Sequence, residues 1–70
     1  MKNYQETSVE ELVAIGKESR ERLLQFMINA QSAAGKDNEL HPDFMDTLFD
    51  ALEELGWDQN TFVKEWTDRG

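Results

Sequence analysis

Apolar and small side chains recur every three or four residues over a long stretch of this chain, and this spacing limits its fold more than any other feature. The set is Val9, Leu12, Gly16, Ser19, Leu23, Phe26, Ala30 and Ala33. A seven-residue period of this kind is typical of the buried face of an α-helix. We therefore predict a helix over about 8–34.

Ordinary helix signals mark both ends of this predicted helix. Ser8 is placed to cap its first turn, with Glu11 at the third position after it, as a capping box requires. Gly35 follows the last periodic residue, where a helix commonly ends. Gly16 is the weak point, because glycine costs about 1 kcal/mol relative to alanine inside a helix. Two helices with a break near 16–19 are therefore the alternative to one long helix.

The second half of the chain predicts two further helices. Pro42 suits the first position of a helix over 42–55, and Gly56 follows the end of that helix. Asp58 is placed to cap a short last helix over 59–67. No stretch alternates with a period of two, so we predict no strand. The predicted fold class is all-α, a small bundle of three to four helices.

A chain of 70 residues has room for one hydrophobic core. We predict a single helical domain over 8–70, preceded by a flexible N-terminal tail over 1–7. Such a small domain buries only about 60% of its unfolded surface. Because the chain has no cysteine, helix packing or oligomerisation must supply its stability.

The periodic face therefore has two interpretations. It is either the core seam between helices of one chain or the interface of a homodimer. The residues assigned to it are Leu12, Gly16, Ser19, Leu23, Phe26 and Ala30. Trp57 and Trp66 are likewise either core residues or exposed aromatic anchors for a partner.

Acidic residues dominate the second half of the sequence. The net charge is −8, and positions 37 to 58 hold eight acids and no base. This charge argues against direct binding to nucleic acid or to an anionic membrane, because phosphates would be repelled. Asp46, Asp50 and Glu54 follow one another at a spacing of four, where like charges destabilise a helix. A functional reason for this cost is expected.

We refer to these acids as the acidic face: Asp37, Glu39, Asp43, Asp46, Asp50, Glu53, Glu54 and Asp58. One interpretation is that they only keep the protein in solution. The other is that they dock on a basic partner, and a row of carboxylates also resembles the charge row of a DNA backbone. We predict a non-enzymatic protein-binding module, an inhibitor or modulator of a basic, nucleic-acid-handling protein, with DNA mimicry as its most specific form. By size and charge it is similar to small products of phages and mobile elements.

The alternative function is a structural or adaptor module that homo-oligomerises through the periodic face of the first helix. Nothing in the sequence points to catalysis. The single histidine, His41, precedes Pro42 as a loop or cap residue would, and the serines have no positioned base. We predict no enzymatic activity, no cofactor and no metal. No apolar run approaches the roughly 18 residues that span a bilayer, and the start of the chain has no hydrophobic signal region. We therefore expect a cytoplasmic protein.

Overall fold

The computed structural model describes residues 4–34 and 40–69, and these residues form an all-α bundle, as predicted. A 3-10 turn, η1 (Tyr4–Glu6), precedes the four α-helices of this part of the chain. The helices are α1 (Val9–Glu18), α2 (Arg20–Ala33), α3 (Pro42–Leu55) and α4 (Gln59–Arg69). No strand occurs in the described ranges.

Side-chain caps begin the helices where the sequence predicted. The Ser8 hydroxyl accepts a hydrogen bond from the Glu11 N–H at 3.2 Å at the start of α1. The His41 Nδ1 accepts one from the Asp43 N–H, also at 3.2 Å, at the start of α3. Gly56 ends α3 with a φ of 76°, a left-handed conformation that favours glycine.

The long periodic stretch forms two helices, so the prediction of one continuous helix is wrong and the alternative with a break is confirmed. Ser19 alone separates α1 from α2, with an extended backbone at φ −168° and ψ 127°. Its N–H still donates to the Ile15 carbonyl at 3.0 Å, and its carbonyl accepts from the Leu23 N–H at 3.2 Å. The break removes the helical bonds of the first three N–H groups of α2, and the Ser19 hydroxyl accepts a hydrogen bond from the Arg22 N–H instead, at 3.4 Å.

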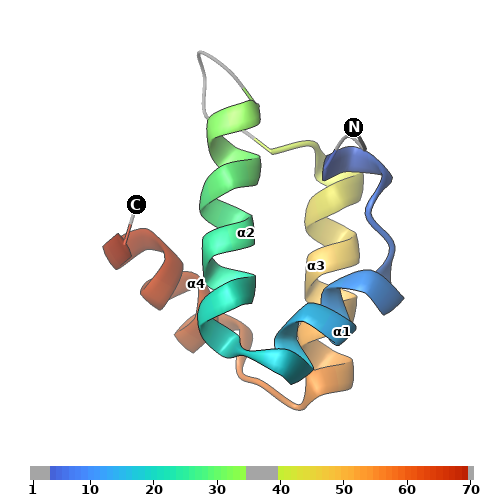
Figure 1. Ribbon diagram of the computed structural model, residues 1–70, viewed down its shortest axis with the longest axis vertical. Helices are drawn as coiled ribbons and strands as arrows, with labels where there is room; N and C mark the ends of the chain where they lie inside the picture. Colours follow the sequence, from blue (N-terminus) through green and yellow to red (C-terminus); the bar gives the residue numbers. More distant parts are fainter. Residues whose placement is uncertain (1–3, 35–39, 70) are drawn as a thin grey trace.

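Figure 1 shows how the helices pack after this break. In that view α2 and α3 stand upright and run in opposite directions, while α1 crosses the lower part of α3. The last helix, α4, packs mainly against α2. Each of the four helices turns one side, which carries buried apolar residues, toward the same hydrophobic core.

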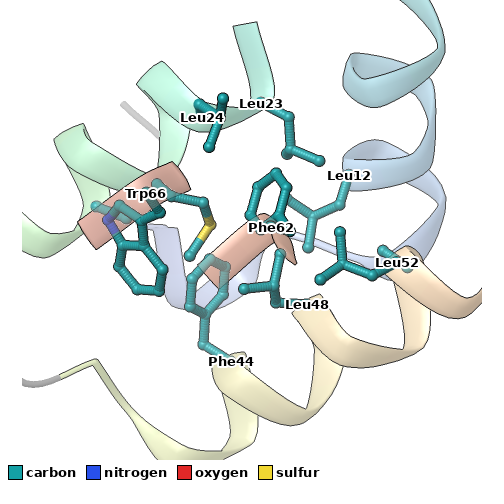
Figure 2. Close-up of a cluster of buried hydrophobic side chains, with 11 residues drawn as sticks. Leu12, Leu23, Leu24, Phe44, Leu48, Leu52, Phe62 and Trp66 are labelled. Carbon is teal, nitrogen blue, oxygen red and sulfur yellow. The ribbon is translucent and has the colours of Figure 1, made fainter. Parts of the chain in front are cut away.

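The hydrophobic core lies where these inward sides meet, as Figure 2 shows. Its largest fully buried side chains are Phe44, Phe62, Leu12, Leu23, Leu24, Met27, Leu48 and Leu52. Each helix supplies at least one of them. The acids on the outward side of α3 owe their position to this burial.

Residues just before α1 also contact the bundle. The Tyr4 ring packs edge-on against the Phe44 ring, with centroids 5.0 Å apart. Thr7 is buried, and its N–H donates to the Tyr4 carbonyl. Positions 4–7 belong to the predicted flexible tail over 1–7, of which residues 1–3 lie outside the described residues. Within the described part of the chain, no helix has the length and apolar character needed to cross a membrane.

Candidate functional site

Five carboxylates of the predicted acidic face line the outward side of α3. They are Asp43, Asp46, Asp50, Glu53 and Glu54, all exposed, and we call them the acidic ridge. At 100° per residue they fall within an arc of about 100°. The opposite side of the same helix carries the buried Phe44, Leu48 and Leu52. Burial of that apolar side turns the acidic ridge to solvent.

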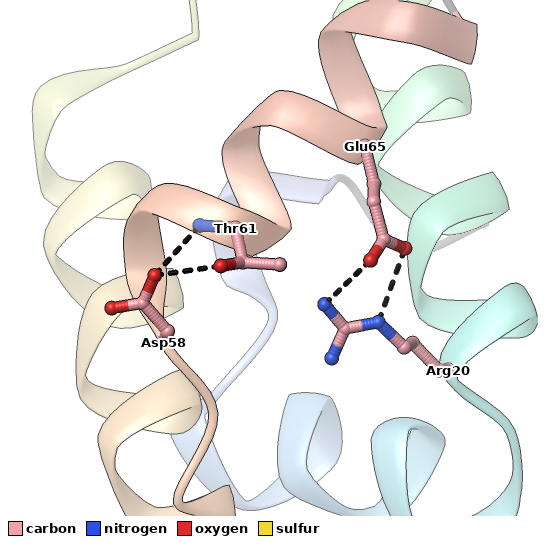
Figure 3. Close-up of polar contacts among 4 residues, drawn as sticks. All are labelled: Arg20, Asp58, Thr61 and Glu65. Atoms are coloured by element: carbon pink, nitrogen blue, oxygen red, sulfur yellow. Dashed lines mark hydrogen bonds and ion pairs between the residues drawn. The ribbon is translucent and has the colours of Figure 1, made fainter.

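The other three members of the predicted acidic face, Asp37, Glu39 and Asp58, are not part of α3. Asp58 is exposed, but it lies beyond α3 and caps the start of α4. Its Oδ2 accepts hydrogen bonds from the Thr61 hydroxyl at 2.7 Å and from the Thr61 N–H at 3.0 Å (Figure 3). These bonds hold the pKa of the Asp58 carboxyl below its usual range. Asp37 and Glu39 lie outside the described residues.

The arginines of the described chain form ion pairs with acids other than those of the acidic ridge. Arg22 pairs with Glu18 at 3.1 Å, and Arg69 pairs with Glu21. Arg20 pairs with Glu65 through two hydrogen bonds. Among residues 4–34 and 40–69, no lysine or arginine lies within ion-pair distance of the acidic ridge.

The charge of the acidic ridge is therefore uncompensated by any of the described lysines and arginines. Among the described residues, the Nδ1 of His41 lies 3.8 Å from the Asp43 Oδ2. Within the ridge, Asp46, Asp50 and Glu54 repel one another at a spacing of four. Such a row projects a concentrated negative potential into the solvent.

A shallow open hollow adjoins the C-terminal part of the acidic ridge. The described residues that line it are Asp50, Glu53 and Glu54 from α3 and Val9 from the first turn of α1. One apolar surface thus lies beside three carboxylates. In the sequence Val9 is only the first member of the seven-residue pattern, and nothing local indicates that α1 begins next to the end of α3.

Most residues of the periodic face are buried within this single chain. Leu12, Leu23 and Ala30 belong to the core, and Gly16 is also buried. A Cβ atom at Gly16 would lie 2.6 Å from the Leu55 Cδ1, so this glycine permits the close approach of α1 to the end of α3. Ser19 and Phe26 are half-buried. In this fold the periodic face serves as the core seam.

The two tryptophans also contact the folded chain. Trp66 is buried, and no hydrogen-bond partner of its Nε1 lies among the described residues. Trp57 is half-buried and stacks on Phe62 with ring centroids 6.0 Å apart. Trp66 is thus a core residue, whereas Trp57 keeps part of its surface exposed.

No pattern in the sequence indicated the cluster around Arg20. Its guanidinium lies 4.7 Å from the centroid of the Trp57 ring and forms hydrogen bonds of 3.0 and 3.1 Å with the two carboxylate oxygens of Glu65 (Figure 3). These bonds lower the pKa of the Glu65 carboxyl. The cluster joins the start of α2 to α4, so its evident role is structural.

Comparison with models of known protein families, with curated protein sequences and with solved structures finds no match. Across the described residues, no three His, Asp or Glu side chains are grouped so that they could hold a metal ion. The acidic ridge is thus the candidate site, and its available chemistry is the binding of positive charge.

Proposed function

We propose that this chain is a non-enzymatic binding module that docks its acidic ridge on a basic surface of a nucleic-acid-handling protein and so inhibits or modulates that protein. The observation that carries the proposal is the separation of charge. The described arginines pair with acids elsewhere, while the acidic ridge has no lysine or arginine partner among the described residues.

The energetic argument favours a binding role over mere solubility. Like charges at a spacing of four each destabilise a helix by about 0.2–0.5 kcal/mol. A mixture of acids and bases on α3 would keep the protein soluble without this cost. The repulsion is relieved when a cationic surface covers the acidic ridge, so the cost in the free protein becomes a contribution to binding.

Nucleic-acid-binding proteins are the partner class that this charge pattern fits best. Their binding grooves attract a regular row of negative charge, and the DNA backbone offers such a row. Neighbouring carboxylates on a helix face lie about 5–6 Å apart, which also makes a regular row. A helix of this kind can therefore enter such a groove in place of the nucleic acid. Blocking the groove in this way would be DNA mimicry.

A capture experiment at low salt tests the proposal. The wild-type chain and the double variant Asp46→Lys with Asp50→Lys are used as baits in a cell lysate, and the captured proteins are identified. We expect basic nucleic-acid-binding proteins on the wild-type bait and a loss of at least tenfold on the variant. Binding that is steered by charge should also weaken steeply between about 50 and 200 mM salt.

The matched control changes the net charge equally at another place. Asn60→Lys, Thr67→Lys and Asp68→Lys together also raise the net charge by four, on exposed positions of α4. This triple variant should capture the same proteins as the wild type. Equal losses with both variants would mean that total charge, not the acidic ridge, attracts the partners. For DNA mimicry, a captured protein must also release a labelled DNA duplex when the wild-type chain is added.

A further inference from the structure

The joint between α1 and α2 consists of one residue, Ser19, whose backbone is extended at φ −168° and ψ 127°. Ser19 keeps the helical hydrogen bonds on both of its sides, from its N–H to Ile15 and from Leu23 to its carbonyl. Its extended φ and ψ alone turn α1 away from the axis of α2. Rotation of this residue to helical angles would join the two helices.

Three observations favour such a joined helix. The seven-residue period of the periodic face passes through Ser19 without a shift. Glu18 and Arg22, which already pair across the joint at 3.1 Å, are four residues apart and would keep this pair in a continuous helix. Joining would also supply carbonyl partners, four residues earlier, for the first three N–H groups of α2.

The contacts that hold α1 in its present place lie mainly on α3 and α2. Leu12 is fully buried among them, and Gly16 approaches Leu55 and Trp57 closely. When the helices join, α1 moves away from its own α3 and leaves that apolar surface open. The same surface on a second copy of the chain accepts the same α1, because the contacting residues are identical.

We propose that Ser19 is a hinge for domain exchange between two copies of this chain, in which α1 of each copy packs on α3 of the other. The exchange would be reciprocal and would close a symmetric dimer, and a short connection between packed elements is a known setting for it. The dimer needs little new interface chemistry, since the contacts of α1 with α3 are made again between the two chains. This inference does not depend on the acidic ridge or on its partner.

Two variants test the proposal, one that favours the joined helix and one that blocks it. Ser19→Ala removes the hydroxyl that caps α2 at 3.4 Å from the Arg22 N–H and favours a continuous helix. Because each dimer contains two hinges, we expect its dissociation constant to fall about tenfold or more. Arg20→Pro should block the dimer, because proline suits the first position of α2 but not the interior of a joined helix.

Arg20→Ala is the matched control, since it also loses the contacts with Glu65 and Trp57 but permits the joined helix. A second blocking variant, with two glycines inserted after Ser19, keeps Arg20 and interrupts the helix. Each protein is refolded from denaturant over about a hundredfold range of concentration, and its mass is measured by sedimentation equilibrium. We expect concentration-dependent dimers for the wild type, Ser19→Ala and Arg20→Ala, and monomers for both blocking variants.

Isotope-filtered NMR of dimers that mix labelled and unlabelled chains distinguishes exchange from simple surface association. Exchange places the Gly16 Hα of one chain beside the Leu55 methyl groups of the other, so a cross-peak between chains is expected. Monomers at every concentration for the wild type and Ser19→Ala would overturn the proposal. Dimers that form equally well with the blocking variants, or that lack the cross-peak, would also overturn it.

Discussion

Arg20 shows how much one side chain can contribute in a domain of this size. Its guanidinium is shared between a carboxylate of α4 and the rings of Trp57 and Phe62, 4.7 and 5.6 Å from its centre. Lysine could not replace it, because only the planar guanidinium can form two parallel bonds and also lie over a ring. The residue thus connects the start of α2 with the segment that leads into α4.

A pH prediction follows from the Arg20–Glu65 pair. Its hydrogen bonds lower the pKa of Glu65 from the ordinary value of 4.5, so the folded state binds this proton less readily than the unfolded state. The stabilisation is therefore present above pH 4.5 and is lost as the pH falls through the lowered pKa. We expect Glu65→Gln to be less stable than the wild type at pH 7 and the difference to shrink in acid.

Urea unfolding at a series of pH values measures this difference directly. The comparison between the two proteins is necessary because every pH effect that does not involve Glu65 is common to both and cancels in the difference. Asp58→Asn is a second comparison, since the pKa of Asp58 is also lowered, by its bonds to Thr61. A stability difference for Glu65→Gln that stays constant down to pH 3 would contradict the assignment.

At the scale of the helices, α3 has an inward side of fully buried apolar residues and an outward side on which like charges repel one another. Asp50 has an acid four residues before it and another four residues after it, at Asp46 and Glu54. We expect Asp50→Lys to replace both repulsions by attractions and to raise the free energy of unfolding by about 0.8–2 kcal/mol. The same change should weaken the binding of the proposed basic partner.

Thermal unfolding followed by circular dichroism tests this prediction. Asp50→Asn is the intermediate variant, because it removes the repulsion without adding an attraction, and it should give about half of the gain. The gain of Asp50→Lys should shrink in 1 M salt, where the Debye length is about 3 Å. A variant that loses stability at low salt would mean that the acidic ridge does not strain α3.

The ends of the helices could be predicted because their causes are local. Ser8, Gly56 and Asp58 act through neighbours within a few residues, and each acts as predicted. The break at Ser19 has a local part, the serine cap of α2, but the periodic pattern runs through it without a shift, so its exact place also depends on the packing of α1 against α3. For the same reason the sequence could place the acids of α3 on one side but could not place Val9 beside them.

At the scale of the whole molecule, a net charge of −8 is carried by a body whose radius of gyration is 11.1 Å. Self-repulsion of this charge opposes the compact state. The packing adds to the effect, because burial of the apolar side of α3 gathers its acids on one outward face. Salt should therefore act on folding and on partner binding in opposite directions.

We expect the melting temperature of the free protein to rise by a few degrees between about 20 and 500 mM sodium chloride, because screening weakens the repulsion more than it weakens the few ion pairs. Differential scanning calorimetry measures this rise. The variant Asp46→Lys with Asp50→Lys and the triple lysine variant on α4 have equal net charge, so they separate total charge from local charge. If the acidic ridge is the main source of repulsion, the double variant loses most of the salt response and the triple variant keeps most of it. Equal responses of the two variants would assign the repulsion to the whole surface, and a melting temperature that falls with salt would show that the ion pairs outweigh the repulsion.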